Sequence, residues 1–255
     1  MIPKIIHYCW LSNDAFPEHI QYCVDSWKKY LQDYDFILWN FDRFPKGKSL
    51  WVDQAFEYKK YAFAADYIRL YALYNYGGIY LDCDVEVIKP FDKYMELSTM
   101  ICWQKDVPGL EVAAFGVEKG LPWIKESLDY YENRPFIKND GGFDVEVLPE
   151  VIEKRLIKQG YSLNNVNSLE EAKCFTNPKA IPVLPSDYFS PKSYLTKEIS
   201  ITKNTVSVHH FDGSWKSESF FDKAEAYIKR WSIFHDFDYL TRFLKGWRKT
   251  FNKHQ

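Results

Sequence analysis

Two aspartates, Asp82 and Asp84, carry the strongest chemical signal in this chain of 255 residues. They follow the short apolar run 79–81, which predicts a strand, and residues two apart on a strand point to the same side. Carboxylates held that close repel each other unless a cation neutralises them. An oxygen-rich pair suits Mg²⁺ or Mn²⁺, which keep open positions for phosphate oxygens. The triplet therefore predicts a site for a metal-bound diphosphate, against the alternative of a solvated strand end.

A second charged pair, Asp66 and Arg69, precedes the aspartates on a predicted helix. The run 56–76 contains helix formers and aromatic residues without Pro or Gly, and Gly77 and Gly78 end it. Residues three apart share one helix face, and the neighbours of this pair on that face are small and apolar. Such a face packs inward, where charged side chains are rarely buried without partners. Asp66 and Arg69 therefore form a plain ion pair, hold a polar ligand, or do both.

Three segments of the chain carry a resemblance to a known enzyme family. The stretch AFAADYIRLYALYNYGGIYLDCDVEVIKPFD, residues 62–92, resembles the sugar-binding DXD region of a glycosyltransferase family that includes fungal initiating mannosyltransferases and many bacterial capsular polysaccharide transferases. The opening IPKIIHYCWLSNDAFPE is similar to that family's first strand, and VHHFDGSW is similar to its closing His-x-x-Gly-Ser-Trp element. The large glucosylating toxins are more distantly similar. The three motifs stand in the family's order.

The resemblance implies a fold, an activity and a cofactor. The implied fold is α/β and GT-A-like, with a Rossmann-type, mostly parallel sheet flanked by helices. The implied activity moves a hexose, with retention of the anomeric configuration, from a nucleotide diphosphate sugar to a saccharide or lipid-linked acceptor. The setting is surface polysaccharide synthesis, such as that of a capsule. A UDP-sugar is favoured over a GDP-sugar as donor, and Mn²⁺ or Mg²⁺ is the expected cofactor.

Trp10 stands at the end of the run 4–10, which is rich in β-branched and aromatic residues and predicts a buried first strand. Ligands of open α/β sheets collect at the carboxyl ends of the strands. The resemblance to the toxins implies that the Trp10 ring stacks on the nucleobase, and an ordinary core tryptophan is the alternative. His7, inside the same strand, is expected to be a core histidine rather than a ligand.

A pair of histidines follows the alternating run 206–208, which predicts a strand, so this pair also lies at a strand end. The resemblance aligns His210 with the third metal ligand of related transferases, and imidazole binds Mn²⁺ better than Mg²⁺. His209 is the competing choice, because adjacent residues on a strand face opposite sides and only one is expected to reach the ion. A solvated loop is the remaining alternative. The resemblance also implies that Ser214 and Trp215 close over the diphosphate.

The expected site combines these motifs. The expected catalytic residues are Asp66, Arg69, Asp82 and Asp84. The expected metal ligands are Asp82, Asp84 and His210. The expected nucleotide contacts are Trp10, Tyr80, Asp82, Ser214 and Trp215. The expected donor-sugar contacts are Asp66, Arg69, Asn139 and Asp140.

The last two of these residues, Asn139 and Asp140, belong to the polar turn 138–144. In the family a polar loop near this point tends to meet the donor sugar. The turn here departs from the family's usual Gly-Pro form, so an ordinary loop at the entry of the next helix is the alternative.

The order of predicted elements indicates one catalytic domain. A helix at 16–30 followed by a strand at 36–39 is the αβ repeat of a doubly wound sheet. Further elements are expected in the second half, as strands at 100–104 and 112–117, helices at 122–133 and 147–158, and a loop-rich segment at 164–205. We expect residues 1–219 to form the catalytic domain, with a nucleotide-sugar-binding half at 1–95 and an acceptor half with the closing motif at 96–219.

The segment 220–255 interleaves large apolar residues with bases at spacings of three or four, which predicts a basic amphipathic helical tail. From Arg242 onward every charge is positive. Such a helix suits the surface of an anionic membrane, where lipid-linked acceptors reside. Packing of the helix on the catalytic domain or on a second subunit is the alternative.

Composition limits the remaining function classes. A chain that is 46% hydrophobic and 18% aromatic supports one sizeable core, and surplus aromatic rings suit sugar binding. The net charge of −2 argues against a nucleic-acid partner. Five cysteines without paired spacing indicate free thiols in a reducing compartment, and neither a signal peptide nor an apolar membrane span is apparent. The expected location is the cytoplasm, with peripheral contact to the inner face of the plasma membrane as an option.

Two other function classes fit part of the pattern. A metal-dependent nucleotidyltransferase or phosphohydrolase uses paired aspartates, but the chain has no Gly-rich phosphate loop and no third carboxylate at a suggestive spacing. A non-catalytic carbohydrate-binding protein uses aromatic residues but does not need two aspartates and a histidine together. The glycosyltransferase interpretation accounts for all of these features.

Overall fold

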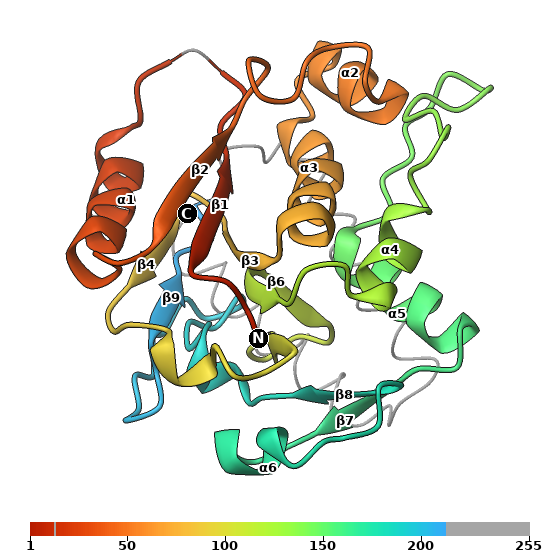
Figure 1. Ribbon diagram of the computed structural model, residues 1–255. Helices are drawn as coiled ribbons and strands as arrows, with labels where there is room; N and C mark the ends of the chain where they lie inside the picture. The colour runs from red at the N-terminus through yellow and green to blue at the C-terminus, as the bar shows by residue number, and fades with distance from the viewer. Residues whose placement is uncertain (13, 213–255) are drawn as a thin grey trace. The chain divides into compact units, whose positions relative to one another are not determined.

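A five-stranded sheet runs through the computed structural model, which describes residues 1–12 and 14–212 (Figure 1). The strand order is β2-β1-β3-β6-β5. These strands are β1 (Ile5–Cys9), β2 (Asp35–Trp39), β3 (Gly78–Leu81), β5 (Thr99–Trp103) and β6 (Leu110–Val117). The first strand pairs in parallel with β2 and β3, whereas β6 pairs antiparallel with β3 and β5. Four strands therefore run one way and β6 runs the other, which confirms a mostly parallel sheet.

Helices cover both faces of this sheet. They are α1 (Glu18–Tyr30), α2 (Leu50–Glu57), α3 (Tyr61–Tyr76), α4 (Pro122–Leu128), α5 (Leu148–Lys158) and α6 (Leu169–Lys173). Side chains alternate along β3, so that Tyr80 joins the core under α2 to α5 while Ile79 and Leu81 join the core under α1. Figure 1 shows α1 and α3 on opposite sides of β1. The predicted α/β class with flanking helices is confirmed.

The helix expected at 56–76 is interrupted. The second helix ends at Glu57, Lys59 takes a positive φ of 55°, and α3 begins at Tyr61. At the other end, Gly77 and Gly78 have φ values of 66° and 102°. A Cβ on Gly78 would lie 2.6 Å from the carbonyl oxygen of Ile5, so only glycine lets β3 start this close to β1. The two glycines therefore place the end of α3 and the start of β3 as predicted.

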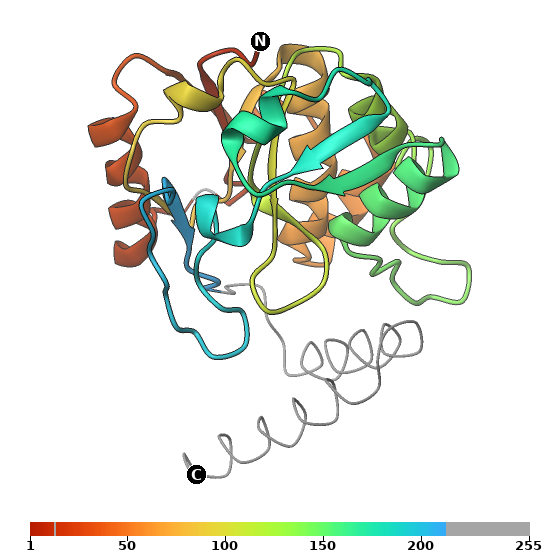
Figure 2. The ribbon, with the colours of Figure 1, turned by 90° about the horizontal axis from the view of Figure 1, so that it is seen from below.

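The later elements follow the sequence pattern with two differences. The fourth helix ends at Leu128, before the expected 133, where Asn133 takes a positive φ of 54°. The segment expected to be loop-rich contains α6 and a parallel two-stranded sheet of β7 (Ser162–Asn165) and β8 (Ala180–Val183), which Figure 2 shows from below. Short 3₁₀ turns lie at Asp92–Tyr94 and Ser186–Tyr188. Strand β7 is short and polar, and β8 is a short apolar run that contains a proline, so neither strand shows the alternation that would reveal it in the sequence.

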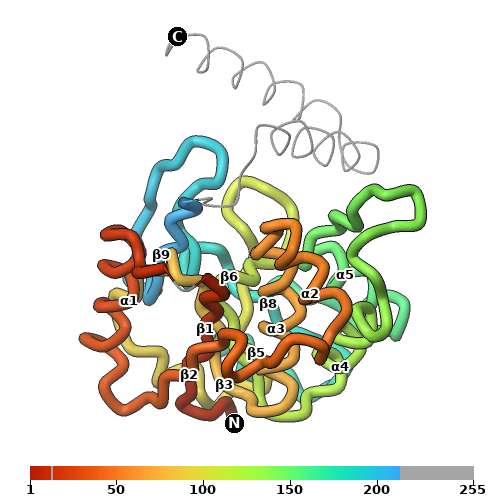
Figure 3. The backbone as a smooth tube through the Cα atoms, turned by 90° about the horizontal axis from the view of Figure 1, so that it is seen from above, coloured from red at the N-terminus to blue at the C-terminus, as the bar shows by residue number. Residues whose placement is uncertain are grey.

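A small antiparallel pair, β4 (Val85–Val87) with β9 (Ser207–His209), joins the two halves of the described chain. Helix α1 supports β4, because Trp27 Nε1 donates a hydrogen bond to the Val85 carbonyl at 2.7 Å. Figure 3 shows β9 between α1 and β6. The pairing register sets Val85 opposite His209, so it brings the C-terminal histidines next to the turn that carries the aspartates.

Some predictions fall outside the described residues. These are the tail at 220–255, the domain limit at 219, and the closing residues Ser214 and Trp215. Within residues 1–12 and 14–212, no helix combines the length and apolar character that crossing a bilayer requires.

Candidate functional site

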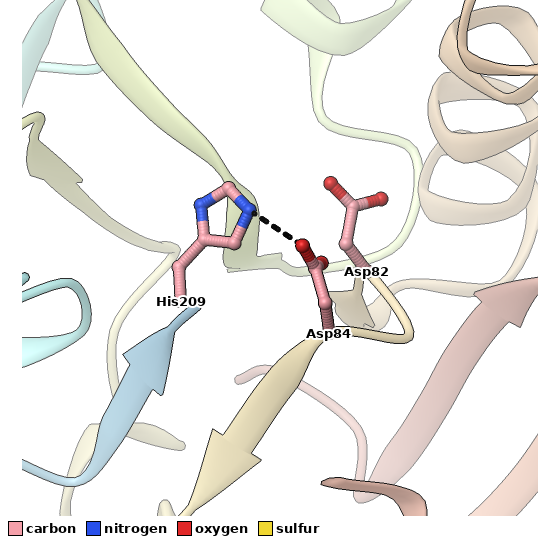
Figure 4. A group of neighbouring side chains, drawn as sticks. All are labelled: Asp82, Asp84 and His209. Atoms are coloured by element: carbon pink, nitrogen blue, oxygen red, sulfur yellow. Dashed lines mark ion pairs between the residues drawn. The ribbon is translucent and has the colours of Figure 1, made fainter. Parts of the chain in front are cut away.

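Asp82, Asp84 and His209 converge at the end of β3 (Figure 4). The Asp82 N–H donates to the Ala113 carbonyl at 2.8 Å, and its own carbonyl accepts from the Val85 N–H at 3.0 Å, which forms a tight turn between β3 and β4. One potential ligand atom from each of the three side chains lies within 4.8 Å of the others. The prediction that both aspartates share one small space agrees with this geometry.

His209 lies between two carboxylates. Its Nε2 atom is 3.5 Å from Asp84 Oδ2, and its Nδ1 atom is 3.3 Å from Glu111 Oε2. Burial by itself lowers the pKa of His209, but Asp84 and Glu111 outweigh that effect and raise the pKa to about 10. Burial likewise acts to raise the pKa of Asp84, yet the attraction of His209 holds that pKa well below its usual range. Asp84 and Glu111 therefore concentrate negative charge around the His209 ring, and this negative charge favours a cation at this place.

Asp66, Arg69 and Asp82 form a second network beside the first. Arg69 Nη2 lies 3.0 Å from Asp82 Oδ1 and 3.6 Å from Asp66 Oδ1, while Nη1 donates to the Val112 carbonyl at 2.5 Å. Burial raises the pKa of Asp66 to about 7, with Arg69 opposing the shift, and burial also raises the pKa of Asp82. The expected ion pair between Asp66 and Arg69 is present, and it extends to the first aspartate of the triplet.

One donor in this network has no partner. The Nε atom of Arg69 is buried and makes no hydrogen bond within the described part of the chain. A buried unpaired donor is costly, so such an atom points to a ligand or a water at this place. This observation supports a polar ligand next to Arg69.

The Trp10 ring lies at the edge of the molecule's core and is only half-buried. It packs edge-to-face on Phe16 with 4.9 Å between ring centroids, and its Nε1 donates to the Asp14 carbonyl at 3.0 Å. Its backbone N–H donates to the carbonyl of Trp39 at the end of β2. Trp10 is therefore not a fully buried core tryptophan, in contrast to Trp39.

Tyr80, which was predicted to contact the nucleotide, lies in the core beside Arg69. Its side chain is almost wholly buried, and the Arg69 guanidinium lies 4.4 Å from the ring centroid. The alternation of β3 turns this ring under α3, whereas Asp82 comes after the strand has ended. Tyr80 supports Arg69 from below through a cation–π contact.

His210 also departs from its predicted position. Its Nε2 atom lies 3.0 Å from Glu86 Oε2, and its backbone N–H donates to the Asp84 carbonyl. His209 occupies the place expected for His210, because adjacent side chains of an extended strand point in opposite directions. The structure thus favours the alternative ligand.

Asn139 and Asp140 lie at the exposed tip of a hairpin that the pairing of Ile137 with Phe143 closes. Asp140 Oδ1 accepts from the Gly142 N–H at 2.9 Å, which is a local turn contact. No hydrogen bond or ion pair described for residues 1–12 and 14–212 joins this tip to the aspartates. The structure thus favours the ordinary loop alternative for this pair.

Glu111 is a residue of the group that the sequence analysis missed. It lies on β6, where every residue is buried, and its carboxylate accepts from the Ala113 N–H at 2.9 Å. The available signal was one acidic residue inside the apolar run LEVAAFGV. Charged residues are almost never fully buried unless they are paired, so a glutamate inside this apolar run predicts a cationic partner.

The donor set fits a divalent metal ion. Asp82 and Asp84 offer carboxylate oxygens and His209 offers one imidazole nitrogen. Such a mixed set of oxygen and nitrogen ligands suits Mn²⁺ better than Mg²⁺, which prefers oxygen alone.

Comparison with known proteins gives a family match for part of the chain. Residues 17–102 match the family described as a glycosyltransferase sugar-binding region containing a DXD motif. This range includes the predicted helix pair Asp66 and Arg69 and the triplet Asp82 to Asp84. It does not include β9.

Several fungal proteins are similar in sequence. Inositol phosphoceramide mannosyltransferase 1 of Schizosaccharomyces pombe is 27% identical over 147 residues, which cover 54% of this chain and 46% of the relative. Inositol phosphoceramide mannosyltransferase 3 of the same yeast is 30% identical over 131 residues, covering 48% and 35%. Mannosyl phosphorylinositol ceramide synthase SUR1 of Saccharomyces cerevisiae is 39% identical over 92 residues, covering 33% and 23%. The chain thus spans less than half the length of these relatives.

Two solved structures superpose on part of this chain. The PaToxG glycosyltransferase superposes with a TM-score of 0.46 at 22% identity, covering 62% of this chain and 70% of the other. A glycosyltransferase involved in the glycosylation of the major capsid of PBCV-1 superposes with a TM-score of 0.43 at 11% identity, covering 86% and 97%.

Proposed function

We propose that this chain, a glycosyltransferase with the DXD-containing sugar-binding region at residues 17–102, transfers a hexose from a nucleotide diphosphate sugar with the help of a divalent metal. The observation that carries the proposal is the convergence of Asp82, Asp84 and His209, whose ligand atoms lie within 4.8 Å of one another. A metal held there would neutralise charge on the departing diphosphate.

The residues around this centre divide the remaining tasks. Asp66 and Arg69 hold donor hydroxyl groups, and the unpaired Nε of Arg69 supplies a donor for that purpose. Trp10 stacks on the base with the exposed part of its ring. Arg69 also holds Asp82 in place through their 3.0 Å contact, so a change at Arg69 affects both the sugar and the metal ligand.

We propose that the reaction retains the anomeric configuration. A double displacement needs a free carboxylate as nucleophile. In the described group Asp66 and Asp82 face Arg69, and Asp84 faces His209, so each carboxylate already has a cationic partner. The incoming hydroxyl would therefore attack on the face that the diphosphate leaves, and a phosphate oxygen would accept its proton.

We propose the donor and the acceptor from the sequence motifs and from the names of the relatives. Two relatives are mannosyltransferases of inositol phosphoceramide, so mannose is the first hexose to test and a lipid-linked acceptor is an option beside a saccharide. A UDP-sugar remains the favoured donor, with a GDP-sugar as the alternative. We keep surface polysaccharide synthesis as the proposed process.

We also propose a cytoplasmic location. All five cysteines are unpaired, which supports a reducing compartment. We propose that the catalytic domain has a donor half at residues 1–95 and an acceptor half at 96–219. We propose that the tail at 220–255 contacts either the membrane or protein.

The test is a screen of UDP- and GDP-sugars in which the released nucleoside diphosphate is measured with and without Mn²⁺. The proposal predicts Mn²⁺-dependent release from one donor, increased by a saccharide acceptor, with an α-linked product from an α-linked donor. A phosphohydrolase would instead cleave within the diphosphate and release a nucleoside monophosphate and a sugar phosphate. A nucleotidyltransferase would release no nucleoside diphosphate from these donors. A carbohydrate-binding protein would release nothing.

A further inference from the structure

Glu111 is a buried carboxylate in an otherwise apolar strand. Its side chain belongs to β6, and the residue is 1% exposed. Burying a charge in such a place is unfavourable unless a cation and hydrogen-bond donors compensate. The Ala113 N–H provides one donor at 2.9 Å, and His209 is the cationic partner, with Nδ1 3.3 Å from the carboxylate. Strand β6 therefore places the negative charge of Glu111 next to Nδ1 of the His209 ring.

The His209 ring is held on its other sides as well. The Phe211 ring lies against it with 3.9 Å between centroids. Phe211 takes a positive φ of 56°, an uncommon backbone conformation for a bulky residue. The pairing of β9 with β4 fixes the backbone of His209 opposite Val85. With Nδ1 engaged by Glu111, the remaining nitrogen Nε2 is the atom that faces Asp84.

We infer that Glu111 is a positioning residue that orients His209 as a metal ligand. Its carboxylate accepts the hydrogen on Nδ1, so that Nε2, which faces the space shared with Asp82 and Asp84, is the nitrogen on which a metal ion would replace the proton. Metal-binding histidines commonly donate their other ring N–H to a carboxylate, which fixes the ring and makes the ligand more basic. The inference rests on the proposed function, because it assumes that the three residues bind a metal.

This arrangement also determines which metal is preferred. Without an oriented imidazole the site consists of two carboxylates, a set that does not favour Mn²⁺ over Mg²⁺. Glu111 therefore contributes to selection of Mn²⁺, although it does not touch the metal itself. Loss of Glu111 lowers the affinity for Mn²⁺ more than the affinity for Mg²⁺.

The experiment is a titration of the full-length protein with Mn²⁺ alone, followed by electron paramagnetic resonance and without any nucleotide sugar. Glu111→Gln is expected to weaken binding by about 10- to 100-fold. Glu153→Gln is the matched control, because Glu153 is a half-buried glutamate that accepts from the backbone N–H of Leu110, the residue before Glu111. That control is expected to bind Mn²⁺ like the unchanged protein.

A double-mutant cycle separates positioning from a general effect of charge. If Glu111 acts through His209, Glu111→Gln weakens Mn²⁺ binding in the unchanged protein but not in the His209→Ala background. The nitrogen coupling of a bound imidazole in the Mn²⁺ spectrum should be present in the unchanged protein and reduced in Glu111→Gln. Glu111→Asp keeps the charge but withdraws it from Nδ1, so it should reproduce the loss even if Glu111→Gln folds poorly.

The outcomes have distinct meanings. Equal losses in both backgrounds, or a nitrogen coupling that persists in Glu111→Gln, would overturn the positioning role while leaving the metal site intact. No binding of Mn²⁺ by the unchanged protein would overturn the inference together with the metal site. Normal Mn²⁺ binding without turnover of any donor would count against the proposed reaction but not against the role of Glu111.

Discussion

His7 and His209 are both withdrawn from most solvent, but they lie in opposite electrostatic surroundings. His7 is on β1, where its Nδ1 accepts from Trp39 Nε1 at 3.2 Å and its Nε2–H donates to the Gly77 carbonyl at 2.8 Å. Burial lowers the pKa of His7 to about 4. His209 is at the end of β9, where two carboxylates overcome the effect of burial and raise its pKa to about 10.

The difference shows that partners, rather than burial, decide what a histidine can do. Neutral partners in the sheet interior hold His7 as a neutral ring, so it serves the packing of β1 against β2 and the end of α3. Carboxylates at the carboxyl edge of the sheet create a place for a cation next to His209. The strand interior and the strand end therefore have separate roles, and substitutions in the two regions should have different effects.

The largest effect is expected at the strand end. Asp84→Asn should lower glycosyl transfer by about a thousand-fold, because a metal in such a site supplies several kcal/mol of charge stabilisation. Because Asp84 also faces His209, the thermal unfolding midpoint measured without metal should fall to some extent, but the variant should remain folded. Near-normal turnover of this variant at saturating Mn²⁺ would contradict the metal role.

In the interior of the sheet, His7 should affect the free energy of unfolding, and this effect should depend on pH. The folded-state pKa of His7 is below the ordinary value, so between about pH 6.5 and pH 4 the unfolded chain binds more protons. Stability contributed by neutral His7 is therefore present above this range and is lost as the pH falls through it. Urea unfolding at pH 7 and pH 5 should show a loss of about 2 kcal/mol from this residue.

The matched variant for that measurement is His7→Gln, which keeps a donor and an acceptor but does not titrate. Its free energy of unfolding should fall less between pH 7 and pH 5 than that of the unchanged protein. Identical pH dependence in the two proteins would show that His7 is not the titrating group.

A smaller effect is expected at Trp10, on the same edge as His209. Stacking of an aromatic ring on a base is worth about 1–3 kcal/mol. Trp10→Ala should therefore raise the dissociation constant for the free nucleoside diphosphate by about ten-fold or more, measured by titration calorimetry. Unchanged affinity in a folded variant would assign Trp10 to packing against Phe16 alone.

The smallest effect is expected at Tyr80, where two substitutions distinguish the contribution of the ring from that of the hydroxyl. Tyr80→Phe keeps the aromatic face below Arg69, so donor turnover should stay close to that of the unchanged protein. Tyr80→Leu removes a cation–π contact worth about 1 kcal/mol, and its turnover should fall further. A larger loss in Tyr80→Phe than in Tyr80→Leu would restore a direct role for the hydroxyl in binding the nucleotide.

Sequence patterns predicted the fold class and the neighbourhood of the aspartates because both depend on local signals. Runs of apolar, β-branched and aromatic residues located β1, β3 and β6, and the pair Gly77 and Gly78 located the end of α3. The interruption at Lys59 was missed, because residues 56–76 are helix formers throughout and a positive φ at lysine leaves no mark in the sequence.

The parts of the site that sequence patterns did not predict depend on contacts between distant segments. The choice between His209 and His210 follows from the register of β9 on β4. This register brings His210 next to Glu86, which is 124 residues away in the sequence. Glu111 joins the group only because β6 pairs beside β3 and faces β9. A period of two along a strand gives the alternation of side chains but not which face meets the partner.

The proposed metal site lies at the strand end that carries His209, and the neighbouring histidine, His210, provides a matched comparison for it. Mn²⁺ affinity of the purified protein should be compared, by electron paramagnetic resonance titration, between His209→Ala and His210→Ala. Both variants lose one imidazole from adjacent positions, but only His209 lies with Asp82 and Asp84. We expect a large loss of Mn²⁺ affinity in His209→Ala and little change in His210→Ala. The reverse result would show that the metal does not bind at His209.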